Sequence, residues 1–246
     1  LSGITLAIKC GSSDATSGIS SNPATGKVVD FFLERGGSRI IFGETTEYIG
    51  AEDVLAKRAI NDDVRKKLLT IVARMENRII QTGVDMRGTQ PSPGNIAGGL
   101  TTIEEKSLGA ISKSGSGPIS GVYEYGERVE RPGLYIMDSP GKEDEFLTGI
   151  AASGANICIF STGGGAPQGF PLVPVVKVAG NPDKVTRMGQ HIDVNASPII
   201  SGEKSIRAIG EEIIKKVLET ASGARSQAEI NAYDKSIGIY TTGPTI

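Results

Sequence analysis

Short apolar runs alternate along this chain with segments that have helical periodicity. The runs are rich in Ile, Val, Leu and Phe, which is typical of buried strands. They cover residues 4–8, 39–42, 134–137, 157–160 and 173–178. Because strands that alternate with helices usually pair in parallel, the pattern predicts an α/β fold. We expect a layered, largely parallel sheet with flanking helices and long glycine-rich loops.

The segments between these runs carry helix start and stop signals. Asn22-Pro23 predicts the start of one helix, and Gly36-Gly37 predicts its end. Asp62 or Asp63 is expected to cap a longer helix. Further helices are predicted over residues 52–58, 143–152 and 203–221, and from Thr101-Thr102 onward. Residues 82–99 are predicted to be a long loop, and loops of that length are usually functional or disordered.

No internal repeat and no clear linker divides the chain. We expect two α/β halves, residues 1–115 and 116–246, packed as one continuous region, with residues 112–121 as the candidate break. The first residue is Leu1 rather than Met. The chain is therefore expected to be a segment of a longer protein whose N-terminal part is absent.

Composition excludes several classes of function. The 246 residues carry a formal net charge of -2 without a basic stripe, which argues against a nucleic-acid partner. The apolar runs are too short to span a bilayer. No secretory signal is visible, so a cytoplasmic protein is expected. Two distant cysteines without a CxxC pattern predict neither a disulfide framework nor a structural zinc site.

Residues 94–115 combine five glycines, an acidic pair and two lysines. Glycines let the backbone approach a ligand closely, and hydroxyl and N–H groups at a helix start favour anions. Anion binding is therefore predicted for Gly98, Gly99, Thr101 and Thr102. The alternative is a plain capping box with solvated charges, which explains one Thr and one Glu but not the glycines.

Proton-transfer groups lie in the same segment. Glu105 or Lys106 is the expected base, and Lys113 is expected to neutralise an enolate or to protonate a leaving group. For each lysine the alternative is a solvated surface charge. Glu44 and Glu47 follow the second predicted strand, where two carboxylates can hold a cation or cap a helix.

A second glycine-rich loop follows the strand at residues 157–160. Thr162 and Gly163 begin it, and its N–H groups can form an anion nest, although a tight turn is the alternative. The loop is neither a Walker motif nor a dinucleotide fingerprint. His191 is the only histidine, so one chain cannot build a three-histidine zinc site. A structural role is the simpler interpretation of His191.

Four sequence strings resemble one known family. In order, they are LAIKCGSSDATSGISSNP, FGETTE, PSPGNIAGGLTTIEEKSLGAISKSGSGPISGV and IFSTGGGAPQG. They are similar to the altronate and galactarate dehydratases, a family that includes the large subunit of sulfolactate sulfo-lyase. The similarity runs from about residue 6 to about residue 223, and the GGLTTIEEKSLG block is specific to it. The resemblance implies an iron-dependent lyase that acts on a hydroxylated sugar acid or a sulfonated hydroxy acid.

The resemblance also implies cofactors, partners and site residues. Fe(II) is the expected metal, with Mn(II) as the alternative, and the expected partners are a small anionic hydroxy acid, an N-terminal domain or small subunit, and further copies of the chain. Cys10 is expected either to ligate iron or to lie beside the substrate, and a small buried residue is the alternative. Ser13 and Asp14 are expected to contact substrate. In the string HIDVN, the resemblance falls on Asp193 as a metal ligand and Asn195 as a substrate contact.

One position departs from the family pattern. The family commonly reads TGRGTP where this chain has TGGGAP over residues 162–167. An arginine there would suit a carboxylate or sulfonate, and Gly164 cannot make that contact.

Two functions from different classes follow. The first is a metal-assisted lyase that removes water from an altronate- or galactarate-type acid to give a 2-keto-3-deoxy acid, or sulfite from sulfolactate. The second is a non-catalytic anion-binding or assembly domain whose chemistry requires the absent N-terminal part.

Overall fold

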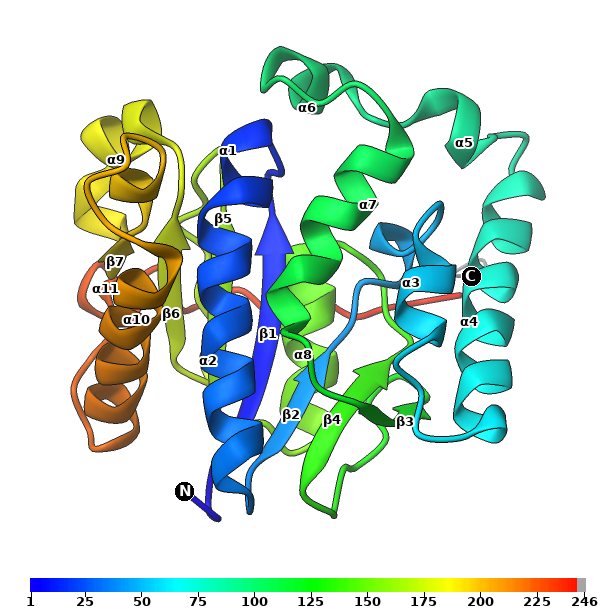
Figure 1. The fold of residues 1–246 in the computed structure, drawn as a ribbon, viewed down its shortest axis with the longest axis horizontal. Coiled ribbons are helices and arrows are strands. Elements are labelled where there is room, and N and C mark those ends of the chain that lie inside the picture. The colour runs from blue at the N-terminus through cyan, green and yellow to red at the C-terminus, as the bar shows by residue number, and fades with distance from the viewer. Residues whose placement is uncertain (243–246) are drawn as a thin grey trace.

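Seven parallel strands form one central sheet in the computed structural model, which describes residues 1–242 (Figure 1). The strand order is β3-β4-β2-β1-β5-β6-β7, and every neighbouring pair runs in parallel. The expected α/β fold with a largely parallel sheet is therefore confirmed. The strands are β1 (Thr5–Gly11), β2 (Arg39–Phe42), β3 (Ile119–Tyr123), β4 (Gly133–Met137), β5 (Ile157–Thr162), β6 (Val175–Ala179) and β7 (Val194–Asn195).

Helices flank this sheet on both sides. The α-helices are α1 (Ala15–Ile19), α2 (Ser21–Arg35), α3 (Glu52–Ala56), α4 (Asp62–Ile80), α5 (Met86–Thr89), α6 (Pro93–Ala97), α7 (Ile103–Ile111), α8 (Glu143–Ala152), α9 (Pro182–Met188), α10 (Ile206–Ala221) and α11 (Gln227–Ile230). The 3₁₀ turns are η1 (Thr45–Glu47), η2 (Ser112–Ser114), η3 (Gly189–His191) and η4 (Ser197–Ile199).

Two apolar clusters bury the two faces of the sheet. Leu6 and Ile8 of β1 belong to the cluster that includes α2, α4 and α10. Ala7 belongs to the other cluster, which α8 completes with Phe146 and Leu147. Burial on both faces explains why β1 is a continuous apolar run rather than an alternating one.

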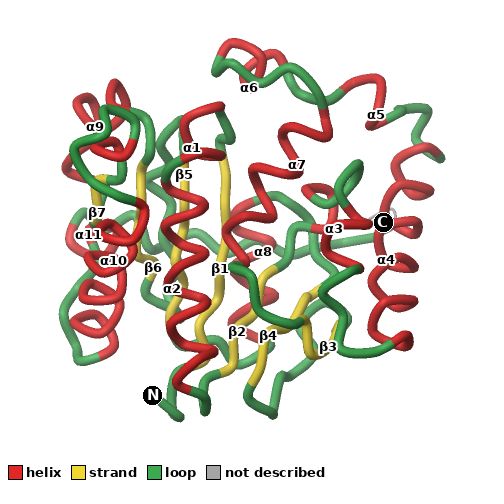
Figure 2. Tube along the Cα trace, viewed as in Figure 1, coloured by secondary structure: helices red, strands yellow, loops and turns green. Residues whose placement is uncertain are grey.

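The connections diverge at β1. The chain leaves β1 through α1 and α2 and returns as β2 on one side, whereas β5 joins the other side only after α8. The loops after β1 and β5 therefore separate at the carboxyl edge of the sheet. In open sheets of this type, ligands bind in the crevice that forms there. Figure 2 shows α1, α6 and α9 standing beyond this edge.

The first long helix starts earlier than Asn22-Pro23 predicts. It begins at Ser21 and follows the separate short helix α1. The Asp14 side chain accepts a hydrogen bond from the Ser17 N–H and caps α1, a local signal that the prediction did not use. The predicted end is confirmed, because α2 ends at Gly36, whose φ is 65°.

The prediction of a long loop over residues 82–99 is wrong, because α5 and α6 lie within it. The side chains of Asp85 and Ser92 cap these two short helices. Another cap was misplaced by one residue: the side chain of Asn61, rather than that of Asp62 or Asp63, accepts the Val64 N–H at the start of α4. The last long helix starts at Ile206 rather than at residue 203, because Ser205 caps it.

Strands β3 and β7 were not predicted. β3 lies partly within residues 112–121, the candidate break, and forms one edge of the sheet beside β4. Strands from both sides of residue 115 thus share one sheet. The division of the chain at that point stays a prediction.

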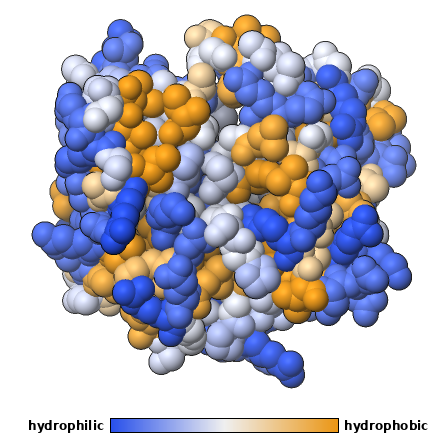
Figure 3. Space-filling view, in the orientation of Figure 1, coloured by the Kyte–Doolittle hydropathy of each residue, from blue (hydrophilic) through white to orange (hydrophobic). Residues whose placement is uncertain are grey.

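Exposed apolar side chains form separate patches among polar ones on the face seen in Figure 1 (Figure 3). Ile19 on α1, Ile96 on α6 and Leu108 on α7 are among the exposed large apolar residues. Across residues 1–242, none of the helices has the length and hydrophobicity needed to cross a membrane.

Candidate active site

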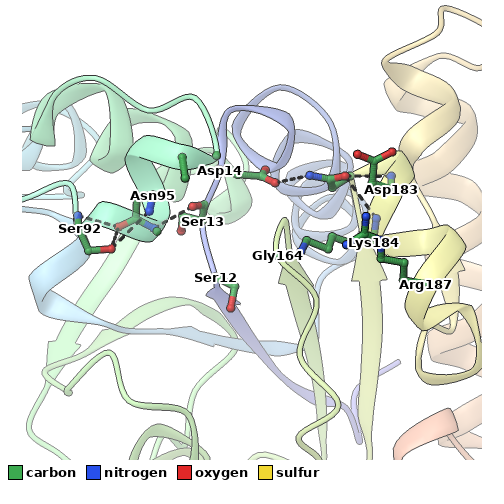
Figure 4. A pocket seen from close by; sticks show the side chains of 13 residues that line it. Ser12, Ser13, Asp14, Ser92, Asn95, Gly164, Asp183, Lys184 and Arg187 are labelled. Atoms are coloured by element: carbon green, nitrogen blue, oxygen red, sulfur yellow. Dashed lines mark hydrogen bonds between the residues drawn. The ribbon is translucent and has the colours of Figure 1, made fainter.

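A pocket of about 510 Å³ opens at the carboxyl edge where the loops after β1 and β5 diverge. The β1 loop contributes Ser12, Ser13 and Asp14, and the β5 loop contributes Gly164. Helix α6 forms one wall and α9 forms the opposite wall (Figure 4). The pocket therefore lies where the fold predicts a ligand, between segments that are far apart in sequence.

Hydrogen bonds from both walls fix the β1 loop. Asn95 of α6 donates its side-chain N–H to the Ser13 carbonyl at 2.8 Å. On the other side, the Asn181 amide donates to Asp14 Oδ2 at 2.8 Å. The other oxygen of Asp14 accepts from the Thr16 hydroxyl and the Ser17 N–H. Asp14 is thus a structural anchor of the pocket, with both carboxylate oxygens engaged.

Two of the predicted substrate-contact glycines pack against Asp14. A Cβ at Gly98 would lie 2.6 Å from the Asp14 Cβ, and a Cβ at Gly163 would overlap the Asp14 carboxylate. Only glycine fits at either position without displacing Asp14. The structure therefore places Ser13, Asp14, Gly98 and Gly163 close together, and their role in substrate binding stays a prediction.

A buried ionic cluster lies at the same edge of the sheet, around Glu44. Lys9 Nζ is 2.7 Å from one carboxylate oxygen of Glu44, and Lys113 Nζ is 2.6 Å from the other. The Cys10 N–H also donates to Glu44 at 2.9 Å, and Lys113 Nζ lies 2.9 Å from Cys10 Sγ. Glu44 itself has a left-handed φ of 73°, which is unusual for a residue with a side chain.

Lys9 and Lys113 outnumber Glu44 in this cluster, and the carboxylates of Glu143 and Glu47 also act on the two lysines, raising the pKa of Lys9 and of Lys113 respectively. Burial by itself would raise the pKa of Glu44, but Lys113 and Lys9 outweigh that effect and hold the pKa of the carboxyl below its usual value. Burial opposes the charge on Lys113, yet Cys10 and Glu44 raise its pKa well above the ordinary lysine value. Burial and Glu44 raise the pKa of Cys10 to about 12, so Cys10 is a neutral thiol at pH 7.

The predicted metal ligands do not assemble into one donor set. Both oxygens of Glu44 are paired with ammonium groups, and Cys10 Sγ contacts Lys113. Asp193 is buried elsewhere, where it accepts the Lys177 N–H and pairs with Lys216. Within residues 1–242, no group of three or more His, Cys, Asp or Glu side chains could hold a metal ion. These residues do not fit a resident ion, and the Fe(II) or Mn(II) cofactor stays a prediction.

Glu47 and Lys106 form a second pair beyond the end of β2. Lys106 Nζ is 3.5 Å from Glu47 Oε1, and each side chain is 14% exposed. The same ammonium donates to the Gln90 side chain at 3.0 Å, two residues before Ser92 of the pocket. Among the described residues, the buried Glu47 Oε2 has no hydrogen-bond partner. Such an oxygen requires an explanation, and a donor on a bound molecule provides one.

The start of α7 engages the other residues of the glycine-rich segment. Thr102 caps the helix by accepting the Glu105 N–H at 3.1 Å. The Glu105 carboxylate accepts from the Thr101 hydroxyl and N–H, and these bonds lower its pKa. Gly99 adopts a φ of 94° just before this turn. These contacts explain the segment as a helix cap, and none of Thr101, Thr102 and Glu105 lines the pocket.

The remaining candidates lie around β5 and β7. Thr162 is buried, and its hydroxyl accepts the Gly165 N–H at 3.0 Å, which shapes the loop that carries Gly164. Asn195 ends β7, where its side chain accepts from Ser197 rather than facing the pocket. His191 packs edge-on against Tyr233 and is also outside the pocket lining.

Comparison with known proteins identifies the family. A family description for the C-terminal part of D-galactarate/altronate dehydratase matches residues 1–245. The chain belongs to this dehydratase family. The family suggested by the four sequence strings is thereby confirmed.

Several curated relatives are similar in sequence to most or all of this chain. The chain is 40% identical over 226 residues to the (2R)-sulfolactate sulfo-lyase subunit beta of Chromohalobacter salexigens, covering 91% of this chain and 58% of that protein. It is 35% identical to altronate dehydratase of Bacillus subtilis, covering 100% of this chain and 49% of the relative. It is 37% identical to galactarate dehydratase (L-threo-forming) of Escherichia coli, covering 90% and 42%. The chain thus spans about half the length of the curated relatives it matches.

Sequence reasoning missed several pocket residues of this family member. They are Asn95, Asn181, Lys184 and Arg187. Asn181-Pro182 lies three residues after the end of the apolar run at 173–178 and carries the same start signal as Asn22-Pro23. That signal would have placed α9 and its two basic side chains at the carboxyl edge of the sheet.

Proposed function

We propose that the chain provides the substrate pocket of a lyase that removes water from a sugar acid of the altronate or galactarate type. The observation that carries this proposal is the polar pocket at the carboxyl edge of the sheet, where the buried cluster of Lys9, Glu44 and Lys113 also lies. Family membership supports the reaction class, since relatives carry the name dehydratase. The product would be a 2-keto-3-deoxy acid.

The reaction requires two proton transfers and one broken bond. A base takes the proton from the carbon next to the carboxylate, and the C–O bond of the neighbouring hydroxyl breaks as that oxygen gains a proton and leaves as water. The resulting enol then becomes the keto form. Charge builds up on the substrate carboxylate in the first step, so a positive environment lowers the barrier.

Lys106 is the proposed base, after its ammonium group has given a proton to water, and Glu47 is its positioning partner. Neither residue lines the pocket, but Lys106 contacts Gln90, two residues before the pocket residue Ser92. The buried Glu47 Oε2, which has no hydrogen-bond partner among the described residues, can accept a hydrogen bond from a substrate hydroxyl or a water molecule. Glu105 is less suited, because its carboxylate accepts two hydrogen bonds from Thr101 at the helix start. Lys113 is held by Glu44 and Cys10, where its positive charge can stabilise the enolate without moving.

A metal ion would polarise the substrate carboxylate when bound. Fe(II), with Mn(II) as the alternative, is proposed on the resemblance alone, and none of the steps above depends on it. Because the residues described do not form a metal site, any ligands would have to include groups outside them. The proposed partners are an N-terminal domain or small subunit and further copies of the chain, in the cytoplasm.

Loss of sulfite instead of water is a second candidate. The 40% identity to a protein named sulfolactate sulfo-lyase subunit beta favours it. In that reaction the C–S bond would break in place of the C–O bond, with the same proton removal beforehand. A third candidate is a non-catalytic anion-binding or assembly role for this chain by itself.

One experiment separates these functions. The full-length protein, loaded with Fe(II), is supplied separately with altronate, galactarate and sulfolactate. The 2-keto acid formed from each substrate is measured, together with the sulfite released from sulfolactate. We expect turnover that falls steeply in Lys106→Met and little in Glu105→Gln, the matched control from the same helix turn. Absence of product from every substrate would refute the lyase proposal. Anion binding by the chain without turnover, with activity gained on adding the remaining part of the protein, would support the third candidate.

A further inference from the structure

Helix α9 presents two positive side chains to the pocket, and neither pairs with an acidic side chain in the part of the chain that the structure describes. Lys184 and Arg187 are three residues apart on the helix and therefore share one face. Within residues 1–242, neither side chain takes part in an ion pair or a side-chain hydrogen bond. Asp183 of the same helix also lines the pocket but forms no ion pair with them (Figure 4).

The opposite wall differs in chemistry. It consists of Ser92, Asn95 and the β1 loop, whose hydroxyl and amide groups are neutral. Its one carboxylate, that of Asp14, is engaged by Thr16, Ser17 and Asn181. A ligand with hydroxyl groups at one end and an anionic group at the other would therefore lie with the anion toward α9.

The β5 loop contributes no charged side chain to the pocket, because its lining residue is Gly164. A Cβ at Gly164 would lie 2.8 Å from the Ser12 Cβ, so residue 164 cannot carry a side chain while Ser12 occupies that space. Ser12 has a φ of 51°, and its side chain lies against Gly164, with Oγ 3.5 Å from the position of a Cβ there. Lys184 packs beside the same loop, with its Cβ 3.9 Å from the position of a Cβ at Gly165. The positive contact in this pocket thus comes from α9 and not from the β5 loop.

We propose that Lys184 and Arg187 form a clamp for a second anionic group of the substrate, at the end remote from the carbons that react. This proposal rests on the proposed function, because it assigns that pocket to a hydroxy acid. The clamp favours dianionic hydroxy acids, with either a second carboxylate or a sulfonate, over hydroxy acids with a single carboxylate. A planar guanidinium and a flexible ammonium together can hold either group.

The test compares substrates on the full-length protein. Galactarate carries two carboxylates, sulfolactate a carboxylate and a sulfonate, and altronate a single carboxylate. For Arg187→Gln and Lys184→Gln we expect KM for the preferred dianion to rise ~10–100-fold, which is the loss of one charge-assisted hydrogen bond. KM for altronate should change less than about threefold, and kcat should stay near that of the wild type, because a remote anion contributes equally to ground-state and transition-state binding.

Controls separate the clamp from general effects. Arg207→Gln removes an exposed arginine that pairs with Glu211 on α10 and should leave every KM unchanged. Arg187→Lys keeps a charge and should recover most of the dianion selectivity. Equal changes for dianions and altronate, or no change for any of them, would overturn the clamp. A larger effect with sulfolactate than with galactarate would identify the sulfonate as the group held.

The clamp and the lyase reaction can fail separately. If the wild type converts none of the three acids, the proposed function fails, and calorimetry with galactarate and altronate then tests the clamp alone. The clamp predicts tighter binding of galactarate by the wild type and loss of that preference in Arg187→Gln. Equal affinities in the wild type would refute it.

Discussion

Glu44 is the residue whose removal tests the buried cluster most directly. Its carboxylate contacts Lys9 and Lys113, and each of the three side chains is at most 1% exposed. Glu44→Gln keeps the shape of the side chain but removes the carboxylate that both buried ammonium groups contact. Breaking a buried ion pair in this way costs ~3–5 kcal/mol. In a chain of this size that corresponds to a fall in Tm of ~6–20 °C.

A second variant shows that charge is the cause. Glu44→Gln combined with Lys113→Met removes one of the two unpaired charges, so the double variant should be more stable than Glu44→Gln alone. Glu212→Gln provides the matched surface control, because its pair with Lys204 is about half exposed and contributes little. Thermal and urea melts of the four proteins at pH 7 measure these differences.

The pH dependence gives an independent check. Lys113 and Lys9 hold the pKa of Glu44 below its value in the unfolded chain, so its stabilisation is present above the unfolded pKa of 4.5. That contribution is lost as the pH falls below 4.5 and through the folded pKa. Stability of the wild type should therefore decline more steeply in acid than that of Glu44→Gln. Parallel pH profiles, or a cost at pH 7 no larger than that of Glu212→Gln, would refute the reasoning.

Three further outcomes are expected. Burial lowers the pKa of Lys177 from 10.5 to about 8, so holding this buried side chain charged at pH 7 destabilises the fold. Lys177→Met should therefore raise the free energy of unfolding by ~1–3 kcal/mol at pH 7, and by less at pH 10, where the folded protein holds the neutral amine. An equal gain at both pH values would contradict this. Cys10→Ser should leave the metal content of the full-length protein unchanged in elemental analysis. A loss of metal would instead support the expectation that Cys10 is a metal ligand. Gly164→Ala should cost ~1–3 kcal/mol through contact with Ser12, and Ser12→Gly should remove most of that cost in a double-mutant cycle; purely additive effects would show that the two residues do not compete for space.

Local patterns predicted those parts of the fold that depend on local interactions. The strand over Arg39–Phe42 and the helix over Glu143–Ala152 have the predicted bounds, because a continuous apolar run and a helical period each specify their own element. The predictions failed where a single capping side chain starts a helix: Asp14 caps α1, which was not predicted, and Ser205 starts α10 three residues later than expected. The single-turn helices α5 and α6 were not predicted, because they are too short to show a helical periodicity of apolar residues.

Site residues were predicted in part, and for a physical reason. The candidate segments after β1 and β5 lie at one edge of the sheet, because parallel neighbouring strands have their carboxyl ends at the same edge. Pairing between side chains was not predictable, since Glu44 and Lys113 are 69 residues apart and Asp14 and Asn181 are 167 apart. Charged residues next to glycine looked equally suited to catalysis, to metal binding and to helix capping.

The sequence by itself determined the α/β class, the parallel sheet and the family, because periodicity and motif strings are properties of neighbouring residues. Only the tertiary structure decided which charges meet. It paired Glu44 with two lysines instead of exposing it to an ion, and it brought α9 to face α6 across the pocket. Such contacts depend on the order in which strands enter the sheet, which local sequence patterns do not specify.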